Sequence, residues 1–216
     1  MTINLSSLRD IYTITFPVVG LVILSWGLWW TRPRKEISGF YENRQSAPQV
    51  IDDIKTAKEV WAAWHTATSI GVSGELKKQG LADKLTRLIL MAPRGNYISI
   101  HTQMMSNISE EKLRVDIETA YKRFKGEGVK GICYFDGLML SMVICNPTDD
   151  KRGWIRVEPW SPFLETGNRP VFYIYARKHP SAFASLRDAY DTVWKEINAP
   201  GIANPLTSHH KEGSQT

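Results

Sequence analysis

The sequence predicts an α/β fold, in which a mixed sheet is flanked by helices and preceded by one N-terminal transmembrane helix. Two observations lead to this class. Residues 11–30 contain no charged side chain. After them, short apolar runs typical of buried strands alternate with longer segments in which apolar residues recur every three or four positions. Without the anchor and tails, the remaining residues are enough for one domain of ordinary size.

The uncharged run Ile11–Trp30 predicts an anchor in the lipid bilayer. A helix rises about 1.5 Å per residue, so this run would span roughly 30 Å, the thickness of the hydrocarbon layer. A cleaved signal peptide would instead carry positive charge before the run and small residues after it. Here the run ends in indoles and basic side chains, namely Trp26, Trp29, Trp30, Arg32, Arg34 and Lys35. We therefore expect an uncleaved signal-anchor.

The basic flank also predicts the orientation of a single-pass membrane protein. Positive charge beside a span stays in the cytoplasm, so the N-terminus would lie outside and the C-terminal domain would be cytoplasmic. The expected organisation is a short tail over residues 1–10, the transmembrane helix over 11–30 and a juxtamembrane linker over 31–49. A cytoplasmic α/β domain over 50–198 and a disordered tail over 199–216 would follow.

Charge and cysteine content exclude several classes of protein. The chain has 27 basic and 22 acidic residues, of which four and two lie in Met1–Glu36, so the remainder carries only +3. Such a weak balance does not favour a nucleic-acid partner. The two cysteines, Cys133 and Cys145, form no metal-binding or disulfide pattern. We expect two buried thiols, no metal and no cofactor.

The first half of the domain reads as helix, strand, helix and strand. We expect a short helix at Val50–Ala57, a buried strand at Glu59–Trp64, a short helix within Gly74–Asp83 and a second strand at Leu85–Met91. Strand, helix and strand in this order predict a parallel pair. The pattern of Tyr97–Met105 favours neither a helix nor a strand.

Ser109 is expected to cap a helix whose first turn holds Glu110 and Glu111. One face of that helix is apolar, through Leu113, Ile117, Tyr121 and Phe124.

Beyond it, Asp136-Gly137 separates the apolar runs Val129–Phe135 and Leu138–Cys145, which predicts a hairpin with a type I′ turn. Two more strands are expected at Gly153–Glu158 and Val171–Tyr175. Pro180 should begin the last helix, with a buried stripe formed by Phe183, Leu186, Tyr190, Val193, Trp194 and Ile197.

No catalytic motif stands out in the sequence. The glycines of Gly126–Gly131 match a dinucleotide-binding pattern, but they follow a helix and precede a strand, which is the reverse of the order that this site needs. The candidate ligand-binding residues are His65, Arg94, His101 and Asp136, because they lie near predicted strand ends and carry charge or an imidazole.

Several segments together resemble one unit of the phospholipase D-like superfamily. They are AKEVWAAW, KLTRLILMAPRG, VKGICYFDGLMLSMVI and FASLRDAYDTVWKEI, within Val50–Ile197. The resemblance implies a strand carrying H-x-K-x-x-x-x-D, whose histidine attacks a phosphodiester while the lysine holds the phosphate. With Asp136 aligned to the aspartate, Val129 stands for the histidine and Gly131 for the lysine. The resemblance therefore implies a degenerate unit, a pseudoenzyme.

The sequence leaves three functions open. The first is a membrane-anchored, non-catalytic module for binding, sensing or regulation. The second is an enzyme acting on a phosphodiester or lipid headgroup through unidentified residues, with His65, His101 and Arg94 as candidates. The third is a structural partner in a membrane complex, through the aromatic-rich segment Trp154–Phe163. A homodimer, a protein partner and a small ligand all remain open.

Overall fold

The computed structural model describes residues 39–66, 75–104, 108–137, 140–159 and 166–199. The chain divides into two compact units, 1–38 and 39–216, and all described residues belong to the second. The predicted anchor Ile11–Trp30 and residues 200–216 of the predicted tail lie outside the described residues. Within the described ranges, no helix combines the length and the apolar character that crossing a bilayer requires.

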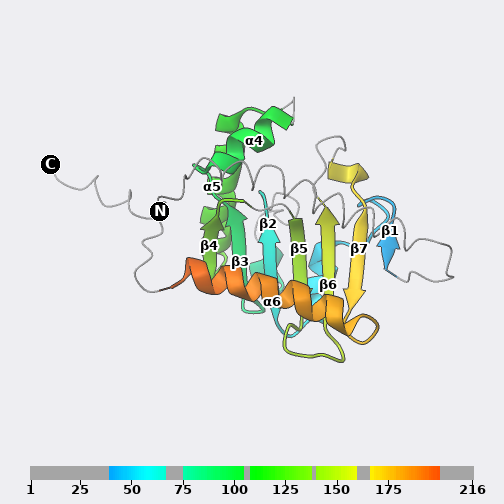
Figure 1. Ribbon diagram of the computed structural model, residues 1–216. Coiled ribbons are helices and arrows are strands. Elements are labelled where there is room, and N and C mark those ends of the chain that lie inside the picture. The colour runs from blue at the N-terminus through cyan, green and yellow to red at the C-terminus, as the bar shows by residue number, and fades with distance from the viewer. Residues whose placement is uncertain (1–38, 67–74, 105–107, 138–139, 160–165, 200–216) are drawn as a thin grey trace, which may run out of the picture. The chain divides into compact units, whose positions relative to one another are not determined.

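The domain is a seven-stranded mixed sheet with helices on both faces (Figure 1). Its strand order is β1-β7-β6-β5-β2-β3-β4. The strands are β1 (Phe40–Tyr41), β2 (Val60–Trp64), β3 (Leu85–Met91), β4 (Ile132–Phe135), β5 (Leu140–Cys145), β6 (Trp154–Pro159) and β7 (Val171–Tyr175). The helices are α2 (Val50–Thr56), α3 (Glu75–Lys78), α4 (Asn96–Met104), α5 (Glu110–Gly126) and α6 (Pro180–Ile197), with a short 3-10 helix at Thr166–Asn168.

Strand β2 is at the centre of the sheet and is buried along its whole length. It pairs in parallel with β3, as the sequence predicts, and antiparallel with β5. Val60, Ala62 and Trp64 face one apolar cluster, whereas Trp61 and Ala63 face another. A strand covered on both faces needs a continuous apolar run, which explains the sequence VWAAW.

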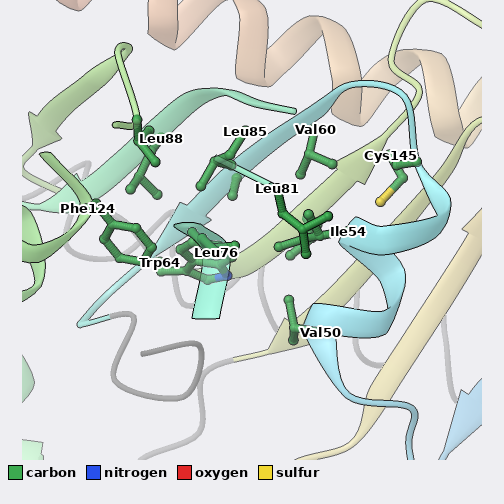
Figure 2. Packing of buried hydrophobic residues seen from close by; sticks show 14 of the residues in the cluster. Val50, Ile54, Val60, Trp64, Leu76, Leu81, Leu85, Leu88, Phe124 and Cys145 are labelled. Carbon is green, nitrogen blue, oxygen red and sulfur yellow. The ribbon is translucent and has the colours of Figure 1, made fainter. Parts of the chain in front are cut away.

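The two clusters define the two layers of helices. Helix α6 crosses one face of the sheet and contributes Phe183 and Tyr190 to the core there (Figure 1). The Tyr190 ring stacks on Trp61 with the ring centroids 5.6 Å apart. Figure 2 shows the packing on the opposite face, where side chains of α2, α3 and α5 meet the strands. Its residues include Val50, Ile54, Leu76, Leu88 and Phe124.

The predicted hairpin around Asp136-Gly137 is wrong. Strands β4 and β5 do not pair, because β3 and β2 lie between them. Strand β4 instead joins β3 in parallel at the edge of the sheet, after the long crossover through α4 and α5. A type I′ turn needs positive φ at both central residues. Gly137 has φ 130°, whereas Asp136 is not among the residues with positive φ.

Three other expectations need adjustment. The helix expected within Gly74–Asp83 is a single turn, and Tyr97–Met105, which the sequence left unassigned, is mostly the helix α4. Residues 39–49, expected to belong to the linker 31–49, include β1, which pairs antiparallel with β7 through Phe40 and Phe172. Pairing with β7 at the edge of the sheet gives this segment a defined structure, which its polar sequence alone does not predict.

The positions of the remaining helices are confirmed, although only Phe183 and Tyr190 of the stripe predicted for the last helix are fully buried. The Ser109 hydroxyl accepts a hydrogen bond from the backbone N–H of Lys112 and caps α5, and Pro180 begins α6. Cys133 and Cys145 are buried and form no disulfide. Burial raises the pKa of the Cys133 thiol to about 12.

Candidate functional site

The carboxyl ends of the three parallel strands bring polar residues to one edge of the sheet. His65 directly follows β2, and Asp136 directly follows β4. Helix α4, which carries His101, follows β3 after a short turn. Open α/β sheets commonly bind ligands at the carboxyl ends of their parallel strands. This edge is therefore where a ligand site is expected.

The structure brings two of the four predicted site residues together. The rings of His65 and His101 have centroids 5.3 Å apart and are tilted by 49°. Both side chains are buried, with 6% and 4% of their surface exposed. Nδ1 of His65 and the hydroxyl of Ser141 on β5 form a hydrogen bond of 3.2 Å, which fixes the orientation of the first ring.

The environment of His101 favours a neutral imidazole. Burial and, to a smaller extent, the positive charge of Arg169 lower the pKa of His101 to about 4. At neutral pH the His101 ring can accept a proton or a hydrogen bond, but it carries no charge of its own.

A buried network of charges lies on the face of the sheet that α2 covers. Arg156 on β6 is only 2% exposed and is the largest fully buried side chain among the described residues. Its guanidinium donates to the Glu158 carboxylate at 2.9 Å, to the Tyr173 hydroxyl at 2.9 Å and to the Asp53 carboxylate at 3.2 Å. It also donates to the backbone carbonyl of Pro48.

This network ties α2 to the sheet. Asp53 belongs to α2, and its carboxylate also accepts a hydrogen bond of 2.8 Å from the Tyr173 hydroxyl on β7. Desolvation raises the pKa of Asp53, whereas its hydrogen bonds from Tyr173 and Arg156 oppose that shift. Buried charges of this kind are tolerated only when they are paired and hydrogen-bonded, as these are.

Two further arginines surround Glu158. The Arg44 Nε lies 3.6 Å from a Glu158 carboxylate oxygen. Arg169, just before β7, is 9% exposed. Burial lowers its pKa, the negative charge of Glu158 opposes that shift, and the positive charge of Arg44 adds to it. Arg169 also acts on His101, which links the charge network to the histidine pair.

The other two predicted residues do not join this cluster. Arg94 is exposed in the turn after β3. The Asp136 carboxylate accepts hydrogen bonds of 2.9 Å from the backbone N–H groups of Asn96 and Tyr97, at the start of α4. Asp136 is thus a helix cap, which replaces the turn role that the sequence gave it.

The sequence-based prediction missed Arg44, Asp53, Arg156, Glu158 and Arg169. The available signal was the pair Arg156 and Glu158, two charged residues at alternate positions of a predicted strand. Such spacing places both side chains on one face of the sheet, but it does not distinguish a solvated face from a buried ion pair. Within the described ranges, no group of three or more metal-ligating side chains is found.

The aromatic-rich segment Trp154–Phe163 is only partly described. Trp154 is half-buried and packs against the core cluster on the α2 side, while residues 160–163 lie outside the described residues. A separate open depression of about 480 Å³ lies beside α5 and β4. Its walls are formed by Tyr121, Lys125, Gly128, Val129, Lys130 and Ile132, none of which belongs to the polar cluster.

Comparisons with known proteins give no family. No family model matches the chain, and no curated protein matches it. Among solved structures, an archaeal chromatin protein, TrmBL2, described as showing a novel mode of DNA binding, is similar at a TM-score of 0.44 and 12% identity. The match covers 88% of this chain and 64% of that protein, so this chain spans less than two thirds of its length. A likeness of this degree supports no inference about function.

Proposed function

We propose that the chain is a membrane-anchored, non-catalytic module for binding, sensing or regulation, with a phospholipase D-like fold facing the cytoplasm. The observation that carries the non-catalytic part is the state of the two motif positions. Val129, in the place of the histidine, is 3% exposed and packs in the apolar core. A Cβ atom added at Gly131, in the place of the lysine, would collide with the backbone carbonyl oxygen of Thr86.

The binding part of the proposal rests on the polar cluster. His65, Ser141 and His101 meet at the carboxyl edge of the parallel strands, where ligands are commonly held. Arg44 and Arg169 add positive charge nearby. Buried, oriented polar side chains at such an edge are suited to recognising a small polar ligand.

The anchoring part rests on Ile11–Trp30 and its basic flank. The full chain should remain in the membrane fraction after carbonate or high-salt washing, and removal of Met1–Lys35 should release a soluble domain. A cysteine introduced at Ser208 should resist an impermeant reagent in intact cells. Because Cys133 and Cys145 are buried, they should add little background. A freely soluble full chain, or labelling from outside, would refute the anchor or its orientation respectively.

The catalytic test uses the full chain purified in neutral detergent. We expect no hydrolysis of phosphatidylcholine, nucleic acid or a generic phosphodiester, because the motif positions supply neither a nucleophile nor a phosphate-binding cation. His65→Ala and His101→Ala variants are the controls. Robust turnover by the wild-type protein that disappears in either variant would refute the proposal.

One observation favours the enzyme alternative. The fold brings the ring centroids of His65 and His101 to 5.3 Å from each other, although 35 residues lie between them in the chain. Two imidazoles at such a distance can serve as base and acid in a transfer reaction. The low pKa of His101 favours the base role for that ring at neutral pH. The same hydrolysis assay decides between the two functions.

A further inference from the structure

Arg169 is a buried cation whose hydrogen bonding is incomplete within the described residues. Only 9% of its surface is exposed, and its Nε atom has no hydrogen-bond partner among the residues that the structure describes. An uncompensated charge in a protein interior is costly, so such a group is normally paired or hydrogen-bonded. The position therefore indicates a counter-charge beyond the described side chains.

Among the described residues, the surrounding charges supply that counter-charge only in part, because Glu158 acts on Arg169 but is shared with Arg44 and Arg156. The connected network contains three arginines against two carboxylates, those of Asp53 and Glu158, and both carboxylates already contact Arg156. Glu158 also lies near Arg44. The described part of the network thus has an excess of positive charge.

The positive and polar groups around Arg169 come from three parts of the fold. The backbone N–H of Arg44 donates to the carbonyl oxygen of Gly167 at 3.1 Å, which holds the segment before α2 against the segment that leads into Arg169. Arg169 and His101 are close enough to interact electrostatically, and His101 belongs to α4. Arg44, Arg169 and His101 thus approach one region from different elements.

We propose that Arg169, Arg44 and His101 form a binding site for a phosphoryl group, which names the ligand class of the binding function proposed above and rests on it. Guanidinium groups match phosphate oxygens in charge and hydrogen-bond geometry. A tetrahedral phosphoryl group offers several acceptor oxygens to donors that arrive from three elements, whereas a planar carboxylate offers two. The shared chemistry covers free phosphate, a soluble phosphate monoester and a lipid headgroup.

The main rival occupant is an acidic side chain of this protein. Glu165 lies outside the described residues and is only four positions from Arg169 in the sequence. If the Glu165 carboxylate neutralised Arg169, no ligand would be needed. In a buffer without phosphate, a phosphoryl site predicts that removal of Arg169 leaves thermal stability unchanged or higher. An ion pair with Glu165 predicts that the same change lowers it, so thermal unfolding distinguishes the two.

The binding experiment uses the full chain in neutral detergent, with inorganic phosphate, glycerol phosphate and phosphatidate as probes. Calorimetric titration should show binding, and thermal unfolding should show stabilisation by the ligand. Arg169→Gln should weaken binding by about tenfold or more, because it removes a charge-assisted contact. Arg177→Gln, which changes an exposed arginine beyond β7, is the matched control and should leave binding unchanged.

Comparison of the probes identifies the source of the phosphoryl group. Equal binding of phosphate and phosphatidate would indicate a soluble ligand, whereas clearly tighter binding of phosphatidate would indicate a lipid headgroup. Binding of none of the three by the wild-type protein, or full binding by Arg169→Gln, would overturn the proposal. If either of these binding results is found and no hydrolysis occurs, the proposed non-catalytic function still stands. Histidine-dependent hydrolysis would refute that function, whether or not phosphate binds.

A second measurement addresses the Glu165 rival. In phosphate-free buffer, Arg169→Gln should be as stable as the wild-type protein or more so, because an incompletely compensated buried charge is removed. The proposal is overturned if Arg169→Gln and Glu165→Gln each lower the unfolding temperature and the double variant is no less stable than either, since that pattern marks a pair.

Discussion

The carboxylate of Asp136 accepts a hydrogen bond of 2.9 Å from the backbone N–H of Tyr97, so the residue that follows β4 caps the helix that follows β3. A second bond of 2.9 Å, from the N–H of Asn96, completes this cap. The contact is close, since a Cβ atom at Gly95 would collide with the same carboxylate. Two parts of the carboxyl edge, 39 residues apart in the chain, are joined in this way.

Removal of this cap should destabilise the domain. We expect Asp136→Ala to lower the free energy of unfolding by about 1 kcal/mol, within the range of about 0.5–2 kcal/mol that is typical for a lost helix cap. Urea unfolding followed by circular dichroism measures the change. Asp136→Asn should recover most of it, and Asp83→Ala, at an exposed position, is the control. A loss no larger than that of the control would contradict the cap.

Removal of Arg156 should have a much larger effect. Arg156→Met leaves the carboxylates of Asp53 and Glu158 buried without their main partner, which typically costs about 3–5 kcal/mol. Arg152→Met is the matched control, because the Arg152 side chain is 70% exposed in its ion pair with Asp149. That exposed pair should contribute little, because solvent screens it. Similar unfolding midpoints for the two variants would show that the buried network contributes little.

The apolar residues along α6 should contribute unequally to the free energy of unfolding. Phe183 is 1% exposed, so Phe183→Ala should cost about 3–5 kcal/mol. The sequence predicts the same cost for Trp194→Ala if that side chain is core. Trp194 is only half-buried, although its ring stacks on Tyr190, so we now expect a smaller loss of about 2–3 kcal/mol. Equal thermal destabilisation by the two substitutions would contradict this ranking.

Acid should destabilise the domain partly through His101. The pKa of this imidazole falls from 6.5 to about 4 in the folded chain. Between these values the unfolded chain binds a proton that the folded chain does not, so stability falls as the pH falls from 6.5 to about 4. One such group contributes a slope of at most about 1.4 kcal/mol per pH unit.

The histidine effect is isolated by substitution. His101→Gln should flatten the pH dependence of unfolding in that window, measured by urea titrations in phosphate-free buffer. His179→Gln, at the exposed N-cap of α6, is the control and should leave the profile unchanged. An identical loss of slope in both variants would argue against a special environment for His101.

Local patterns predict the elements of this fold better than their pairing. The runs VWAAW and LTRLILM identify two strands because side chains buried on both faces leave no polar positions. Asp136-Gly137 misleads because its turn chemistry suits a hairpin, whereas its carboxylate caps the distant α4. No local signal reports a capping partner that lies 40 residues away.

The candidate site was predicted only in part for the same reason. His65 and His101 can be proposed from their positions near strand ends, but their contact depends on the crossover that returns α4 to the edge of the sheet. Arg156 is an unusual residue for a core position, and its burial depends on Asp53 and Tyr173 from two other elements. Sequence patterns describe each element alone, whereas these contacts arise only when the sheet is assembled.

The close packing at Gly131 affects how this protein could change over evolutionary time. A side chain at this position would collide with the carbonyl oxygen of Thr86, and the Trp194 ring is also near. If the phospholipase D-like resemblance holds, reverting glycine to lysine would first disrupt the pairing of β3 with the segment entering β4. The intermediate would lose stability before it gained any chemistry. Under the proposed phospholipase D-like fold, a lysine at position 131 would therefore need compensating changes around Thr86 and Trp194 before it could serve any chemistry.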